Sequence, residues 1–176
     1  IYKLHKIENK GHEIAFHSST HPDFVKTSRV NGLDHIINFE IKEGLEKMRR
    51  DGFNPVNFAY PYGRHTQQLH GNLLPFFKSL RVTSNKKNYL NCLVQKKGRN
   101  QILYGCPVDQ NSFINDQQIK SLIRNAAEKK LCALLYAHEI ERTSYPYHIS
   151  TKRIRMIATA AKEDNVRFVT VKEITE

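Results

Sequence analysis

The chain has 176 residues, of which 39% are hydrophobic and 26% are charged, a composition typical of a folded domain with a sizeable core. No apolar run approaches the ~20 residues that a membrane-spanning helix requires. The first residues, Ile1-Tyr2-Lys3-Leu4, have the pattern of a helix rather than of a signal peptide, so they do not indicate a compartment.

The net charge is +11 with histidines counted as neutral. Such a charge can simply maintain solubility, or it can attract nucleic acid, anionic lipid or an acidic glycan. The Lys and Arg residues form short scattered clusters without a recognised nucleic-acid motif, so nucleic-acid binding is not the favoured interpretation. Cys92, Cys106 and Cys132 are odd in number and widely spaced, which fits neither a disulfide framework nor a Cys-x-x-Cys site.

The first half of the chain alternates between helix and strand patterns. Apolar residues recur at helical spacing from Ile37 to Met48, Gly11 and Gly52 are good helix ends, and Pro75 should kink or divide a helix. The elements expected here are a helix over 1–10, a strand over 12–16, a helix over 34–51, a strand over 56–60 and a helix over 66–80.

The second half shows the same alternation. Asn115 or Asp116 and Ser150 are good helix N-caps. The continuous apolar run over 131–137 suits a strand that is covered on both faces. The elements expected here are short strands over 81–84, 89–95 and 101–106, a helix after 116, a strand over 131–137, a helix after 150 and a last strand over 166–171.

Strands that alternate with helices predict an α/β fold with a mainly parallel sheet, either open or closed into a barrel. In such folds the functional site lies at the carboxyl ends of the strands. His17 and His21 follow the first expected strand, Tyr62 follows the second, and His138 ends a third. We therefore expect these four residues around one groove.

The pair His17 and His21 has a spacing that can hold a metal ion. Two neutral imidazoles four positions apart can bind one divalent ion, although a catalytic zinc normally takes about three protein ligands. The sequence alone also allows both histidines to be ordinary surface loop residues, and allows His138 to be a hydrogen-bonded histidine without a catalytic role. His65 and His70 are expected on an exposed helix surface.

Four segments resemble the polysaccharide deacetylase family, carbohydrate esterase family four. A Gly-His-Glu-Ile strand followed by His-Ser-x-x-His covers residues 11–21, and Tyr-Pro-Tyr-Gly covers residues 60–63. A strand-end histidine after a Leu-rich run covers 134–138, and the stretch over 147–174 is similar to the last helix and strand of that family. The matches occur in the order of the family and extend over nearly the whole chain.

The resemblance implies a distorted (β/α) barrel of about seven strands, here a single domain over 1–176 that lacks its N-terminal strand. It implies a divalent metal, preferably zinc with cobalt or nickel as alternatives. It also implies hydrolysis of N-acetyl or O-acetyl groups on a glycan such as a chitin-like polymer or peptidoglycan. A protein of this kind is expected to be secreted or associated with the cell envelope.

The resemblance also assigns roles to residues. His17 and His21 would be metal ligands, the backbone N–H of Tyr62 would stabilise an oxyanion, and His138 would be the general acid. Asp109 is the candidate for orienting His138. The first motif of the family, which supplies the general base and the third metal ligand, would lie upstream of residue 1.

Two other functions remain open at this stage. The same fold could serve as a non-catalytic carbohydrate-binding or cell-envelope protein, or the chain could be a basic nucleic-acid-binding domain. Metal content separates the first alternative from an enzyme, and a steep loss of nucleic-acid affinity with salt would identify the second.

Overall fold

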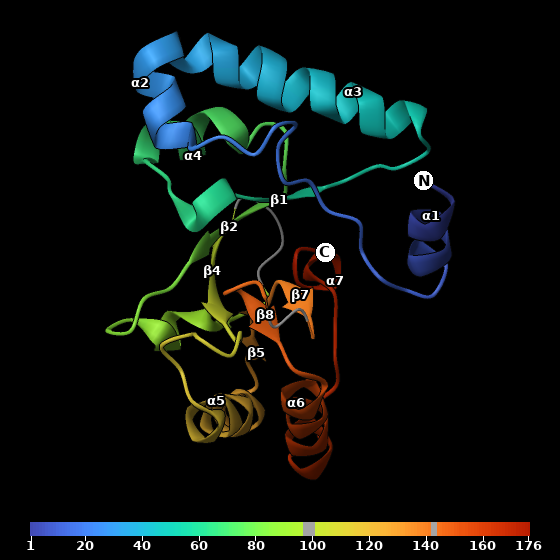
Figure 1. Cartoon of the computed structure of the whole chain (residues 1–176), viewed down its shortest axis with the longest axis vertical. Helices are drawn as coiled ribbons and strands as arrows, with labels where there is room; N and C mark the ends of the chain where they lie inside the picture. The colour runs from blue at the N-terminus through green and yellow to red at the C-terminus, as the bar shows by residue number, and fades with distance from the viewer. Residues whose placement is uncertain (97–100, 142–143) are drawn as a thin grey trace. The chain divides into compact units, whose positions relative to one another are not determined.

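The computed structural model describes residues 1–96, 101–141 and 144–176 (Figure 1). The chain divides into two compact units, and each is described by itself. Unit 1 comprises the described residues of Ile1–Val82, Lys97–Ile102 and Thr170–Glu176, and unit 2 those of Thr83–Lys96 and Leu103–Val169.

The fold is mixed α/β, as predicted, and its main sheet has four strands in the order β1-β2-β4-β6. β1 pairs in parallel with β2, with Phe58 opposite Leu80, and β4 pairs in parallel with β6, with Cys106 opposite Leu135. In the described residues this sheet is a curled half-barrel of four strands, whereas the closed barrel of about seven strands is not seen. The four strands are β1 (Asn57–Ala59), β2 (Ser79–Thr83), β4 (Gln101–Pro107) and β6 (Leu135–Tyr136).

The predicted strand over 131–137 is divided into two short strands. β5 (Cys132–Ala133) pairs antiparallel with β3 (Leu93–Val94), whereas β6 pairs with β4. The partner changes at Leu134, whose N–H donates to Cys92 O at 2.9 Å and whose carbonyl accepts from Cys106 N at 2.9 Å. The expectation that both faces of this run are covered is wrong, because residues 131–136 are only half-buried.

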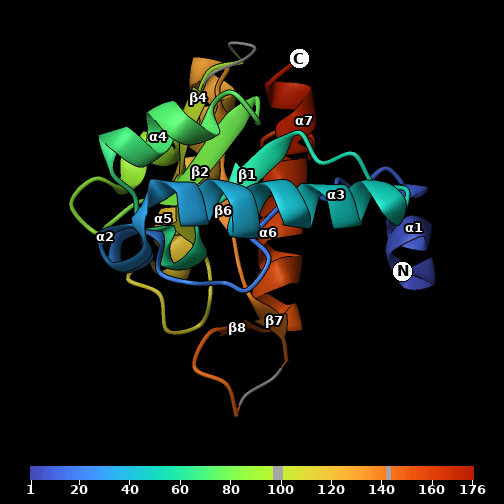
Figure 2. The same cartoon turned by 90° about the horizontal axis from the view of Figure 1, so that it is seen from above.

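The helices of unit 1 include one long run, drawn in blue to teal in Figure 1 and seen from above in Figure 2. The predicted helix over 34–51 is confirmed within this run, but its middle is a π-helix. Gly32, with φ of 83°, breaks the helix just before it. The run consists of α2 (Phe24–His35), η1 (Ile36–Lys42) and α3 (Glu43–Arg50). The other described helices of this unit are α1 (Tyr2–Glu8), η2 (Pro61–Gly63), α4 (Gln67–Leu73) and α7 (Val171–Ile174).

Aromatic side chains form the centre of unit 1. The ring of Phe58 lies 5.1 Å from Phe77 and 6.0 Å from Phe16, measured between centroids. Phe16 N donates to Asn57 O at 3.0 Å, and Ala59 N donates to Phe16 O at 2.9 Å. The expected strand over 12–16 therefore pairs with β1 only at Phe16, and this pairing places the following loop beside the end of β1.

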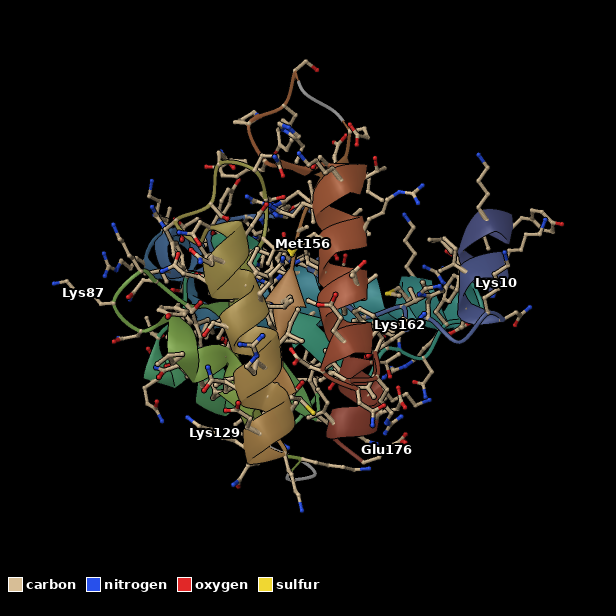
Figure 3. All side chains as sticks on the ribbon, turned by 90° about the horizontal axis from the view of Figure 1, so that it is seen from below. Lys10, Lys87, Lys129, Met156, Lys162 and Glu176 are labelled. Atoms are coloured by element: carbon tan, nitrogen blue, oxygen red, sulfur yellow. The ribbon has the colours of Figure 1, made fainter. Side chains whose placement is uncertain are left out.

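In unit 2, α5 (Asp116–Lys129) and α6 (Thr151–Glu163) lie side by side (Figure 3). Both predicted caps are confirmed: Asn115 forms a capping box with Gln118, and Ser150 Oγ accepts from Arg153 N at 3.2 Å. The helices pack their apolar faces into the core of this unit, next to η3 (Tyr89–Cys92). Buried core residues include Cys92, Cys106, Ile119, Leu122, Ile123, Ile149, Ile157, Ala160 and Ala161.

The last predicted strand, over 166–171, is wrong. Residues 166–170 form no strand, and Phe168 is 70% exposed. Thr170 instead starts α7 with a capping box, in which its N–H donates to Glu173 Oε2 at 2.7 Å and its hydroxyl accepts from Glu173 N at 3.2 Å. The local cap occupies an N–H that a strand ladder would otherwise use.

None of the helices in the described ranges combines the length and the apolar composition needed to cross a membrane.

The expectation that His70 is exposed is wrong, because it is buried in α4. Its Nδ1 lies 3.1 Å from the Tyr60 hydroxyl, and its ring stacks on His65 with centroids 4.7 Å apart.

The buried His70 predicts an acid-sensitive contribution to stability. Burial, with a further contribution from the charge of His65, holds the pKa of His70 below its usual value. Below about pH 6.5 the unfolded chain therefore binds a proton that the folded chain does not, and the free energy of unfolding should decrease as the pH falls. Urea denaturation at several pH values should show this decline in the wild type and a smaller decline in His70→Gln.

The reduction should be partial, because burial also lowers the pKa of His65. His12→Gln, which removes an exposed histidine of the same unit, should keep the wild-type slope. An H70Q variant with an unchanged slope would contradict the prediction.

Candidate functional site

The first candidate site lies in unit 1, in the loop that follows Phe16. His17 Nδ1 donates to the carbonyl oxygen of Ala59, at the end of β1, at 2.7 Å. This hydrogen bond fixes the tautomer and orients the ring, as backbone carbonyls do for metal-binding histidines. His17 Nε2 then faces His21 Nε2 at 3.1 Å, and both residues are exposed.

The separation of the two Nε2 atoms fits a shared metal ion. With zinc–nitrogen distances of ~2.0–2.1 Å, two nitrogens 3.1 Å apart subtend an angle of about 100° at the ion, which is near tetrahedral. The same separation also fits an N–H···N hydrogen bond between one protonated and one unprotonated nitrogen. Within the described ranges no third His, Cys, Asp or Glu joins the pair to form a group that could hold a metal ion.

A buried carboxylate holds the loop between the two histidines. Glu40, in η1, is 4% exposed. Its Oε2 accepts from Ser19 N at 3.1 Å and from Thr20 N at 3.0 Å, and its Oε1 accepts from the Thr20 hydroxyl at 2.6 Å. Ser19 Oγ donates to the Glu40 carbonyl at 3.2 Å. Short hydrogen bonds to an ionised group are stronger than neutral ones, so this carboxylate fixes the loop.

Two features of the helical run allow the loop to pack closely against it. π-helical segments frequently occur at functional sites, and this one carries Glu40. One turn further, Gly44 is buried, and a side chain at its Cα would collide with Ser19 Oγ and come within 2.5 Å of Phe16 Cζ. The absence of a side chain at Gly44 therefore lets the loop pack directly on the helix.

Three residues at this site have strained backbone conformations. Ser18, His21 and Tyr62 all have positive φ, of 71°, 60° and 57°. Such conformations are costly for residues with side chains and are found where the surroundings enforce them, often at functional sites. The Tyr62 ring packs edge-on against His21 at 4.8 Å, and this ring is 63% exposed. The structure thus brings together His17, His21 and Tyr62, three of the four residues expected around one groove. The fourth, His138, belongs to unit 2.

The second candidate site lies in unit 2 and consists of Asp109 and His138. Asp109 is 1% exposed. Its Oδ2 accepts from His138 Nδ1 at 2.8 Å and its Oδ1 accepts from His138 N at 3.0 Å. The carboxylate therefore fixes both the backbone and the ring of the histidine, whose side chain is 45% exposed. This arrangement leaves Nε2 as the nitrogen that can exchange a proton with a ligand.

Hydrogen bonds also hold the backbone of Asp109 in place. Arg153, from α6, donates through Nη1 to the Asp109 carbonyl at 2.6 Å and to the Val108 carbonyl at 3.3 Å. Arg153 Nε lies 2.7 Å from Asp116 Oδ1, at an angle that makes an ion pair rather than a hydrogen bond. Ser112 Oγ also donates to the Asp109 carbonyl, at 2.7 Å.

The sequence reasoning found the histidines and missed the residues that hold them. Glu40 had a detectable signal, because Ile36, Glu40 and Gly44 form a stripe at helical spacing on which a charged residue is unexpected. Arg153 had no such signal, because it is one of several basic residues on α6. The pairing of Asp109 with His138 is now an observed contact, whereas the catalytic roles of both residues stay predictions.

Comparisons with known proteins do not add to this picture: no family model, no curated protein and no solved structure matches the chain. The assignment of function therefore rests on the residues and contacts described above.

The contacts of Glu40 predict the effect of a conservative change. In Glu40→Gln the amide oxygen could still accept from the N–H groups of Ser19 and Thr20 and the amide nitrogen could donate to the Thr20 hydroxyl, but the hydrogen bonds would no longer be made to a charged group and would be weaker. We expect a loss of about 1–3 kcal/mol in the free energy of unfolding. Urea denaturation measures this loss, and hydrogen exchange at the two loop amides should become faster.

Glu43→Gln is the matched control, because Glu43 begins α3 on an exposed face. Its effect should lie within about 0.5 kcal/mol. If both variants were equally stable and equally protected from exchange, Glu40 would not hold the loop.

Proposed function

We propose that the chain belongs to a metal-dependent hydrolase that removes acetyl groups from an acetylated glycan. The observation that carries the proposal is the pair of Nε2 atoms of His17 and His21, 3.1 Å apart, with His17 oriented by the Ala59 carbonyl. The hydrogen-bonded pair of Asp109 and His138 supports it, because a hydrolase of this class needs an acid for the leaving group.

In this function His17 and His21 would hold a divalent ion, with zinc preferred and cobalt or nickel as alternatives. A bound ion would polarise the acetyl carbonyl and lower the pKa of a water molecule. The proposal requires a further ligand from outside the described residues, as the resemblance to polysaccharide deacetylases implies. The natural substrate class is a chitin-like polymer, peptidoglycan or a related polysaccharide, which would place the protein outside the cell or in its envelope.

The resemblance implies roles in the same reaction for two other groups, the backbone N–H of Tyr62 and the ring of His138. The backbone N–H of Tyr62 would donate to the oxygen that gains negative charge, an interaction worth several kcal/mol in other hydrolases. The positive φ of Tyr62, in η2 shortly after β1, supports this role, because strained backbone conformations are often found at functional sites. His138 Nε2 would give a proton to the leaving nitrogen or oxygen while Asp109 keeps the ring in place.

A second candidate function is binding of a glycan without catalysis. The finding that favours it is that the described residues bring together two possible metal ligands and not three. Such a protein would bind the glycan without binding zinc at His17 and His21, so metal titration separates the two functions.

Metal binding is the first test. Calorimetric titration with zinc or cobalt should show one ion per chain in the full-length protein, and His17→Ala and His21→Ala should each weaken this binding strongly, because each removes one of few ligands. His12→Ala, an exposed histidine of the same unit, is the matched control. Equal affinity and stoichiometry in all three variants would exclude the assignment.

Turnover tests the role of His138. In the full-length protein, His138→Ala should lower acetate release from chitin oligomers or peptidoglycan by roughly 10²–10⁴-fold, the usual contribution of a general acid, while metal content stays unchanged. Asp109→Asn should also lower turnover, because the acceptor of the Nδ1 proton is replaced by an amide. Glu128→Gln on α5 is the control, and near-normal turnover of the H138A variant would remove His138 from the mechanism.

A further inference from the structure

We propose that the ring of Tyr147, with the ring of Tyr145 packed edge-on against it, forms a platform beside His138 on which a pyranose ring of the glycan stacks. The ring bound there would belong to the sugar residue next to the acetylated one. This inference rests on the proposed function, because it assumes that His138 faces the glycan, and it specifies a polymer rather than a single sugar as the substrate.

The platform is part of a continuous row of rings in unit 2. The His138 ring lies 5.8 Å from Tyr136 and 5.3 Å from Tyr147, and Tyr147 lies 5.8 Å from Tyr145, measured between centroids. Tyr145 is 38% exposed and Tyr147 is 50% exposed. A ligand in contact with His138 would therefore meet the Tyr147 ring next.

A sugar ring suits this surface in chemistry and in size. One face of a pyranose ring carries mainly C–H groups and packs on aromatic rings, while its hydroxyl groups stay in water or bind polar neighbours. Tyrosine is suited to such contacts, because it is large, has few rotatable bonds and carries a polar hydroxyl. Two aromatic side chains can bury at most about 300–500 Å², far below the ~1,000 Å² or more that a stable protein–protein interface buries.

The segment that carries the tyrosines is held in place before any ligand binds. β7 (Glu139–Ile140) and β8 (His148–Ile149), drawn in orange in Figure 1, pair in parallel. Glu139 N donates to Tyr147 O at 3.4 Å, His148 Nδ1 donates to Tyr145 O at 2.7 Å, and Gln110 N donates to His148 O at 2.8 Å. A surface that is ordered in advance loses less conformational entropy on binding, so its contacts contribute more to affinity.

The test is a binding measurement without catalysis. Metal-free full-length protein is titrated by calorimetry with the monomer, dimer and tetramer of N-acetylglucosamine. The wild type should bind the tetramer more tightly than the monomer. Tyr147→Ala should weaken tetramer binding by about tenfold, because an aromatic stacking contact contributes of the order of 1 kcal/mol, and should leave monomer binding nearly unchanged.

Two variants serve as controls. Tyr147→Phe keeps the ring and should bind within about twofold of the wild type. Tyr2→Ala removes a more exposed tyrosine, 76% accessible, on α1, and should have no effect. Wild-type affinity for the tetramer in the Y147A variant, or an equal loss for monomer and tetramer, would overturn the platform.

The outcomes separate this inference from the proposed function. If the wild type releases acetate but its affinity does not increase with oligomer length, the platform proposal is wrong and the proposed hydrolase activity is supported. If the tetramer binds through Tyr147 but no acetate is released with added zinc or cobalt, the platform is a glycan-binding surface and the proposed hydrolase activity is wrong. A wild type that binds none of the three sugars would overturn the platform.

Discussion

A carboxylate can be removed from water only if donors replace the water molecules, and both candidate sites depend on this constraint. Glu40 and Asp109 are 4% and 1% exposed. Each is paired with donors from a loop or strand end that carries a histidine: Ser19 and Thr20 in one unit, and His138 itself in the other. Displacing either loop would leave a buried charge unpaired, which costs more than the hydrogen bonds contribute. The positions of the histidines are therefore tied to the stability of each unit.

The parts of the fold that could be predicted are those set by local signals. The helix caps at Asn115 and Ser150 and the helical spacing after Ile37 each depend on residues within a few positions, and all three predictions are confirmed. Strands depend on partners elsewhere in the chain. The strands predicted over 56–60, 81–84 and 101–106 are found as β1, β2 and β4, whereas the predictions over 131–137 and 166–171 fail. An apolar sequence pattern cannot show that the run over 131–137 pairs first with β3 and then with β4. It also cannot show that a capping box beginning at Thr170 replaces the end of a strand.

The same distinction applies to the candidate sites. His17, His21 and His138 could be found because chemically versatile side chains after apolar stretches are visible in the sequence. Arg153 could not, because its importance comes from a contact with a residue 44 positions away. The stripe that marks Glu40 as unusual does not show that Glu40 contacts a loop about 20 positions away. A charged residue on a helix is usually solvated, and only the packing of η1 under the loop makes Glu40 an exception.

The partners of the ring nitrogens suggest why the two sites would differ in chemistry. The Nδ1–H of His17 donates a hydrogen bond to the Ala59 carbonyl, which is neutral, whereas the Nδ1–H of His138 donates a hydrogen bond to the Asp109 carboxylate, which is charged. A neutral acceptor fixes the ring while the imidazole remains uncharged, the form that binds a metal ion. A carboxylate compensates a positive charge on the ring, the form that donates a proton as an acid. In the proposed function, the charge of a single hydrogen-bond acceptor would therefore suit two histidines of the same intrinsic chemistry to different steps.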